Sequence, residues 1–121
     1  SGMPLREFLW SEDMAKACLF LMENIDFSHL KEQKKDEEQR NYHINIGTGK
    51  DISIKELAQK IKEQFNYGGD IVFNTNKPDG TMRKLTDVSK LQSLGWRHEV
   101  EIEEGISKLI RWYVESIDLN R

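Results

Sequence analysis

Three segments of this chain have the apolar spacing of amphipathic helices, whereas the residues between them offer only a few short candidates for strands. The three apolar stripes are Met14, Ala17, Cys18, Leu21 and Met22; Ile54, Leu57, Ala58, Ile61 and Phe65; and Ile106, Leu109, Ile110, Tyr113, Val114 and Ile117. Positions that recur at i, i+3, i+4 and i+7 share one helical face. The strand candidates are residues 6–10, 42–46 and 71–73. We therefore predict an α/β (α+β) lobe of three to four helices and two to three short strands, too few strands for a complete doubly wound sheet.

The first helix has a clear beginning and end. Ser11 is the expected N-cap, and Glu12 and Asp13 place negative charge in the positive first turn. The apolar pattern stops near Asn24, and residues 31–40 (KEQKKDEEQR) hold no apolar side chain. We predict that residues 26–41 form an exposed, charged loop to which we assign no function.

Local signals also mark the second helix. Ser53 and Glu56 have the S-x-x-E spacing of a capping box, and residues 67–69 (YGG) are expected to end the helix. Residues 47–50 (GTGK) lack the spacing of a phosphate-binding loop, so we predict a plain turn between strand and helix. Residues 77–80 (KPDG) predict a tight turn at the end of a strand.

The last third of the chain is expected to hold two helices. Asp87 can cap a short helix through Leu94, which Gly95 ends, and Trp96 follows as an anchor for the core. A longer amphipathic helix begins at Ile102.

Composition excludes several functional classes. The chain has 121 residues, a formal net charge of −3 and one cysteine, which predicts one domain without the broad cationic surface that nucleic acid or an anionic membrane requires. Without a second cysteine or an apolar run of about 18 residues, we expect a reduced, cytoplasmic protein with no membrane span. Cys18 is expected to be a buried filler, and His29, His43 and His98 are too scattered to predict a metal site.

Cationic side chains gather at the boundaries of the predicted elements. Arg6 precedes the first helix, Lys77 lies in the predicted turn, and Arg83 and Lys84 follow that turn. Arginine offers a two-pronged set of donors and lysine a compact charge, which suits a diphosphate. Solvated surface charges are the alternative interpretation.

Three segments of the sequence together resemble the C-terminal part of the GDP-L-fucose synthases, within the extended short-chain dehydrogenase/reductase (NAD-dependent epimerase/dehydratase) superfamily. They are SGMPLREFLWSEDMAKACLFLMEN, HINIGTGKDISIKELAQKIKE and KPDGTMRKLTDVSKLQSLGW. The resemblance implies that residues 1–121 are a single C-terminal sugar-nucleotide-binding lobe, with the Rossmann domain absent. Ser1 and Gly2 could be native, since the family motif has a serine-glycine before this proline, or a remnant of cloning.

The resemblance also assigns contacts with the substrate to individual residues. Arg6 in P-L-R-E-F, and Asp79 and Lys84 in K-P-D-G-T-x-R-K, match family positions that contact the GDP-sugar. Lys77 matches a phosphate-binding arginine of related epimerases, and Arg83 is a weaker candidate. Trp10 stands where the family more often has histidine; it could stack on a ligand base or pack beside the helix.

The implied function is that of the family, in which GDP-4-keto-6-deoxy-D-mannose becomes GDP-L-fucose by 3,5-epimerisation and NADPH-dependent 4-reduction. The family's cofactor loop, Tyr-x-x-x-Lys pair and acid–base residues precede the region seen here, so we assign no catalytic, cofactor or metal residue and expect the fragment alone to be inactive and without bound cofactor. The expected partners are the GDP-sugar, the missing N-terminal Rossmann domain and, for the full enzyme, a second copy in a homodimer. The alternatives are the substrate lobe of another nucleotide-sugar epimerase or dehydratase, and a non-catalytic binding module.

Overall fold

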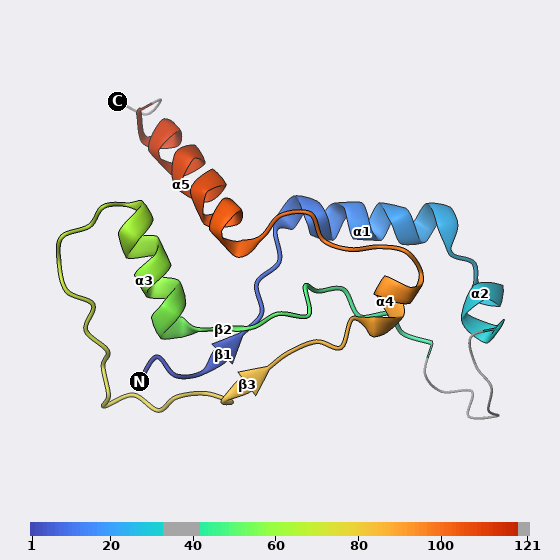
Figure 1. Ribbon diagram of the computed structural model, residues 1–121, viewed down its shortest axis with the longest axis horizontal. Helices are drawn as coiled ribbons and strands as arrows, with labels where there is room; N and C mark the ends of the chain where they lie inside the picture. Colours follow the sequence, from blue (N-terminus) through green and yellow to red (C-terminus); the bar gives the residue numbers. More distant parts are fainter. Residues whose placement is uncertain (33–41, 119–121) are drawn as a thin grey trace.

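The computed structural model describes residues 1–32 and 42–118, which form five helices around a three-stranded sheet (Figure 1). The strands are β1 (Leu5–Arg6), β2 (Ile52–Ser53) and β3 (Arg83–Lys84). The helices are α1 (Ser11–Asn24), α2 (Phe27–Glu32), α3 (Ile54–Gln64), α4 (Ser89–Ser93) and α5 (Ile102–Asp118). This arrangement confirms the predicted α/β class.

The sheet joins segments that are far apart in the sequence. β1 lies between the other two strands, antiparallel to β2 and parallel to β3. Figure 1 shows the sheet low in the view, with α3 and α5 toward one side and α1 and α4 toward the other. The sheet therefore connects the α3–α5 pair, which packs together, to the rest of the chain.

The main core lies where α1 meets α4. Ala17, Leu91 and Trp96 are buried together there. Partly buried apolar side chains pack around these three residues: Leu9, Phe20, Leu21, Ile44 and Ile46. The prediction that Trp96 anchors the core is confirmed.

Our prediction of which face of α1 is buried is wrong by about one residue. Ala17 is buried, but Met14 is 41% exposed, Met22 is 82% exposed and Cys18 is exposed. Because successive helical residues differ by about 100° in direction, the inward face instead begins at Asp13 and continues through Ala17. The helix also starts one position early: its N-cap is Trp10, and Ser11 is its first helical residue rather than its cap.

Two of the three predicted strands are absent from the described sheet, and the third, residues 6–10, is present only as β1 (Leu5–Arg6). Residues 42–46 and 71–73 make no ladder, although Ile44 and Ile46 still pack against the core. The two strands that pair with β1 are β2 and β3, neither of which the sequence pattern predicted. The turn expected at residues 77–80 lies earlier, where the Lys77 amide donates to the Asn74 carbonyl at 3.2 Å.

The observed helix ends agree with the local sequence signals more closely than the strands do. α1 ends at Asn24, and α5 begins at Ile102, as predicted. α3 ends at Gln64 rather than at residues 67–69, because Asn66 takes the positive φ of 50° that terminates it. Gly95 ends α4 with a φ of +103°, as expected of a glycine after a helix.

Residues 26–41 are not all loop. Residues Phe27–Glu32 form α2, and the remainder of the predicted charged loop, residues 33–41, lies outside the described residues.

The apolar stripe of α5 is covered only at its beginning. Ile106 is buried, whereas Leu109, Tyr113 and Val114 are each more than 40% exposed. Within residues 1–32 and 42–118, every helix falls short of the length and apolar content needed to cross a membrane.

The capping box at the start of α3 is present as predicted. The Ser53 hydroxyl accepts from the Glu56 amide at 3.1 Å, and the Glu56 carboxylate accepts from the Ser53 hydroxyl and amide at 2.7 and 3.1 Å. These bonds lower the pKa of Glu56. Because the folded state favours the carboxylate, the stabilisation is present above the ordinary pKa of glutamate and is lost as the pH falls through the lowered value.

We expect Ser53→Ala to raise the pKa of Glu56 toward its ordinary value and to lower the free energy of unfolding by about 1 kcal/mol, because the cap is lost. NMR titration of the Glu56 carboxyl and urea unfolding measure the two effects. Ser93→Ala, on an exposed position of α4, is the control and should leave the Glu56 titration unchanged. A Glu56 pKa that does not move in Ser53→Ala would contradict the assignment.

Candidate functional site

The pairing of β1 with β3 brings two of the predicted site residues together. Leu5 pairs with Arg83, and Arg6 pairs with Lys84. Paired residues on neighbouring strands point to the same face of a sheet, and successive residues alternate. Arg6 and Lys84 therefore share one face, and Arg83 lies on the other.

The guanidinium of Arg6 is held by backbone carbonyls. Its Nη1 donates to the carbonyl oxygens of Leu5 and Thr81, at 2.6 and 2.7 Å. Gly80 lies against the second terminal nitrogen of the guanidinium, since a Cβ atom at position 80 would be 3.4 Å from Arg6 Nη2. Among the described residues, Nη2 and Nε have no hydrogen-bond partner, so these donors remain available to a ligand.

The cations of this region differ in whether a carboxylate neutralises them. Arg83 Nε lies 2.5 Å from Asp51 Oδ2, and this bond raises the pKa of Arg83. Lys84 and Lys77 are both exposed, and neither side chain has an ion-pair partner in the part of the chain that the structure describes. The uncompensated charge is therefore on Arg6, Lys84 and Lys77, while Arg83 already has its counter-ion.

Asp79 is close in sequence to this face, but its carboxylate is engaged elsewhere. It accepts hydrogen bonds from the Ser1 ammonium, at 2.8 Å, and from the Ser1 hydroxyl. These bonds lower the pKa of Asp79. The described contacts do not connect Asp79 or Lys77 to the Arg6–Lys84 pair, which leaves the pair as the centre of the candidate site.

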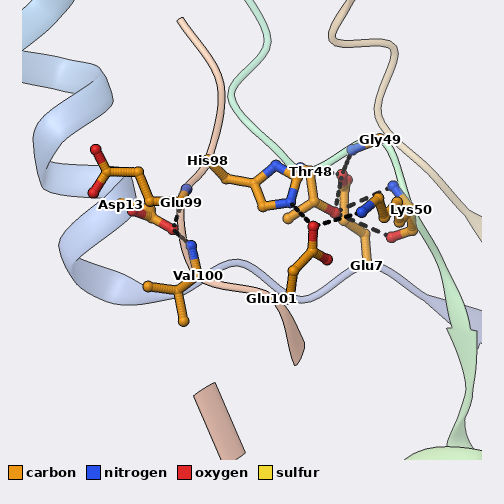
Figure 2. Close-up of polar contacts among 9 residues, drawn as sticks. All are labelled: Glu7, Asp13, Thr48, Gly49, Lys50, His98, Glu99, Val100 and Glu101. Atoms are coloured by element: carbon orange, nitrogen blue, oxygen red, sulfur yellow. Dashed lines mark hydrogen bonds and ion pairs between the residues drawn. The ribbon is translucent and has the colours of Figure 1, made fainter. Parts of the chain in front are cut away.

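Glu7, which the sequence did not single out, holds three segments around this site together, and Figure 2 shows its contacts with one of them, the loop at Thr48 and Gly49. Its Oε1 accepts from the amides of Thr48 and Gly49, both at 2.7 Å, and its Oε2 accepts from the Thr86 amide at 3.2 Å. Burial would raise the pKa of Glu7, but these hydrogen bonds outweigh it and the pKa is lowered. The carboxylate is therefore charged at neutral pH.

The turn at residues 47–50 is thus an anion-binding loop whose anion is part of the chain. Gly49 has a φ of +73°, and a Cβ atom at Gly47 would be 2.5 Å from Glu7 Oε1. Consecutive amides of such a turn create a concave site for negative charge. The prediction of a plain turn omitted this role because the partner, Glu7, is about forty residues away in the sequence.

Asp13 has a similar structural role at the other end of the site region. It is fully buried, and its Oδ2 accepts from the amides of Glu99 and Val100, at 3.1 and 2.9 Å (Figure 2). This contact joins the first turn of α1 to the segment that leads into α5. The sequence indicated only that Asp13 places negative charge in the positive first turn of the helix.

The three histidines do not come together. His98 is nearly buried, with Nε2 3.3 Å from Glu101 Oε1, and the same oxygen pairs with Lys50 Nζ at 2.6 Å (Figure 2). His29 accepts from the Asp26 amide, and the His43 side chain is exposed. No group of three or more potential metal ligands occurs among the described residues.

Trp10 packs beside α5. Its ring lies 3.7 Å from the position that a Cβ atom would take at Gly105, and Lys108 Nζ is 5.7 Å from the ring centroid. Trp10 Nε1 donates to Glu12 at 3.2 Å. These contacts support the packing interpretation of Trp10 over stacking on a ligand base.

An open cleft of about 760 Å³ is lined by Arg83, by residues 48–50 and by the segment after β3. Its cationic lining residues are Lys50 and Arg83, and both are paired with carboxylates, Glu101 and Asp51. We therefore place the candidate anion site at Arg6 and Lys84, where the charge is not compensated, rather than in this cleft.

Comparisons with known proteins agree in the kind of enzyme that they indicate. No protein-family model matches the chain. The chain is 44% identical to the GDP-L-fucose synthase of Escherichia coli over 98% of its own length and 36% of that enzyme. It is 45% identical, with a TM-score of 0.86, to a GDP-6-OMe-4-keto-L-xylo-heptose reductase from Campylobacter jejuni, covering 96% of this chain and 32% of that one.

A third similarity concerns a structure that contains the cofactor. The GDP-L-fucose synthetase of Naegleria fowleri bound to NADP is 30% identical, with a TM-score of 0.77, and the match covers 98% of this chain and 34% of that chain. The chain spans about a third of the length of the curated relatives that it matches. It is therefore related, over nearly its whole length, to one segment of the GDP-L-fucose synthases and GDP-sugar reductases of the extended short-chain dehydrogenase/reductase superfamily.

Proposed function

We propose that this chain provides the nucleotide-sugar-binding surface of an enzyme of the GDP-L-fucose synthase type, with Arg6 and Lys84 binding the diphosphate of GDP. The observation that carries the proposal is the β1–β3 register, which places these two cations on one face. Neither is paired with a carboxylate among the described residues. An arginine fork beside a lysine is well suited to the oxygens of a diphosphate.

The remaining candidates have complementary roles in this proposal. Lys77 adds positive charge at the edge of the site. The Asp79 carboxylate would repel a diphosphate but can accept hydrogen bonds from a sugar hydroxyl or from guanine. The Ser1 hydroxyl donates to this carboxylate, so a donor of the ligand would have to replace that contact.

In the proposed parent enzyme, GDP-4-keto-6-deoxy-D-mannose is epimerised at C3 and C5 and then reduced at C4 with hydride from NADPH. The cofactor would bind to a dinucleotide-binding domain outside these residues, and the enzyme would act as a cytoplasmic homodimer. Binding energy from the remote GDP holds the ketosugar in reactive geometry, so loss of Arg6 or Lys84 should reduce turnover as well as affinity.

Calorimetric titration of GDP into the chain at low salt tests the proposal. Arg6→Ala and Lys84→Ala should each weaken binding by roughly tenfold to a hundredfold, because each removes charge-assisted hydrogen bonds of about 1.5–3 kcal/mol. Arg83→Ala is the matched control: it removes a neighbouring cation that Asp51 already neutralises, and it should change affinity by less than about threefold. Equal losses in all three variants would indicate a diffuse charge effect, and no saturable binding would contradict a preformed site.

A GDP-heptose 4-reductase is a second candidate, since the Campylobacter jejuni reductase is as similar to this chain as the Escherichia coli enzyme is. Both candidates need the same diphosphate site and differ in the sugar. Incubating the full-length parent with NADPH and either GDP-4-keto-6-deoxy-D-mannose or a GDP-4-keto-heptose, with NMR analysis of the products, separates the two. Turnover of the heptose alone would favour the second candidate.

A further inference from the structure

The strands that carry Arg6 and Lys84 are too short to fix their own arrangement. β1 and β3 are two residues long each, so their ladder offers few hydrogen bonds to hold its register. Isolated pairs of short strands are marginally stable. The proposed site therefore needs support from outside the ladder.

Glu7 provides contacts of the kind required. It directly follows Arg6, and its Oε2 accepts from the amide of Thr86, two residues beyond Lys84, at 3.2 Å. This bond extends the β1–β3 contact past the end of the ladder. Its Oε1 accepts from the amides of Thr48 and Gly49, both at 2.7 Å, and from the Thr48 hydroxyl at 3.2 Å. One carboxylate thus connects β1, the segment after β3 and the 47–49 loop.

The loop is shaped to this carboxylate. Gly47 is buried, and a Cβ atom there would lie 2.5 Å from Glu7 Oε1. At Gly49, which has a φ of +73°, a Cβ atom would lie 2.9 Å from a methyl group of Val88. Both carboxylate oxygens already accept hydrogen bonds from the protein, so Glu7 is suited to holding the backbone in place rather than to contacting a ligand.

We propose that Glu7 is a positioning residue for the nucleotide-sugar site: by joining the 47–49 loop to Thr86, it sets the β1–β3 register that aligns Arg6 with Lys84. This inference rests on the proposed function only in naming GDP-sugar as the ligand of the Arg6–Lys84 site. The positioning itself is a property of the free protein and can be tested without GDP. The lowered pKa of Glu7 is consistent with a carboxylate that the folded chain holds in its charged form.

The first test uses NMR of the ligand-free chain. In Glu7→Gln, one acceptor oxygen is replaced by a donor, which cannot satisfy an amide N–H. We expect the cross-strand contacts between Arg6 and Lys84 to be lost or weakened, while the signals of α3 and α5 remain in place. Glu104→Gln is the control, since Glu104 pairs with Lys108 on α5, away from the ladder and from the 47–49 loop. An Arg6–Lys84 contact that is unchanged in Glu7→Gln would overturn the inference.

The second test is a double-mutant cycle on GDP affinity, with every variant first shown to be folded at the assay temperature. If Glu7 acts through Arg6, Glu7→Gln should weaken binding on the order of tenfold in the native sequence, as supporting residues of a site do, and by less than about twofold in the Arg6→Ala background. Equal losses in the two backgrounds would overturn the inference, because they indicate general destabilisation.

The two tests separate this inference from the proposed function. If Arg6→Ala leaves GDP affinity unchanged, or if GDP does not bind, the proposed function fails, and the NMR contact alone then decides whether Glu7 positions the strands. If Arg6→Ala weakens binding but Glu7→Gln changes neither affinity nor the contact, the proposed function stands and the positioning role is wrong.

Discussion

Replacing Trp96 with alanine is expected to lower the free energy of unfolding by about 3–5 kcal/mol, the largest effect that we expect from any single substitution in this chain. Trp96 is 8% exposed and packs with Ala17 and Leu91. The whole indole would be removed from the place where α1 meets α4, and the partly buried residues around it cannot all move inward to fill the space. Urea unfolding followed by far-UV circular dichroism measures the change.

Trp112→Ala is the matched control because the same side chain is removed from a position that is 63% exposed, on α5. We expect it to cost less than about 1 kcal/mol. Trp96→Phe keeps an aromatic ring and should lose less stability than Trp96→Ala, which preserves the test if the alanine variant does not fold. Equal losses at Trp96 and Trp112 would show that Trp96 is not the anchor of the core.

Replacing Asp13 with alanine is expected to lower the free energy of unfolding by about 2–4 kcal/mol. Asp13 is fully buried, and its carboxylate accepts from the Glu99 and Val100 amides. Alanine would leave two partly buried backbone donors without their acceptor, and an unsatisfied group costs up to about 1–3 kcal/mol as its burial becomes complete. The connection between α1 and the segment before α5 would be lost.

Hydrogen exchange locates this effect as well as measuring it. The amides of Glu99 and Val100 should lose protection in Asp13→Ala, while urea unfolding reports the global change. Glu23→Ala is the control, since Glu23 is an exposed acid on the same helix, and it should change stability by less than about 0.5 kcal/mol. Unchanged protection at both amides would show that Asp13 does not hold this segment.

The candidate site could be predicted from the sequence only in part. The resemblance to GDP-L-fucose synthases identified Arg6 and Lys84, and the structure places them together. The resemblance also ranked Arg83 below Lys84, but the physical difference between them, the pairing of Arg83 with Asp51, depends on the fold. Glu7 was missed for the same reason, since a glutamate in an extended segment carries no local signal of the loop that it will meet.

The sequence by itself determined the features that depend on residues within about one helical turn of one another. The capping box of Ser53 and Glu56, the start of α5 at Ile102 and the glycine that ends α4 are all of this kind. Their physical cause is local: a side chain satisfies a nearby backbone group, or a glycine adopts a conformation that other residues avoid.

Only the tertiary structure decided which residues pair across the fold. The alternating pattern of residues 42–46 predicted a strand that has no partner in the described sheet, and the inward face of α1 begins at Asp13 because distant amides, those of Glu99 and Val100, compensate its charge. The Glu7 bond to Thr86 spans 79 residues. Such contacts form only when the whole chain has folded, because their free energy must exceed the entropy lost in closing long loops. The alignment of Arg6 with Lys84 is therefore a property of the fold.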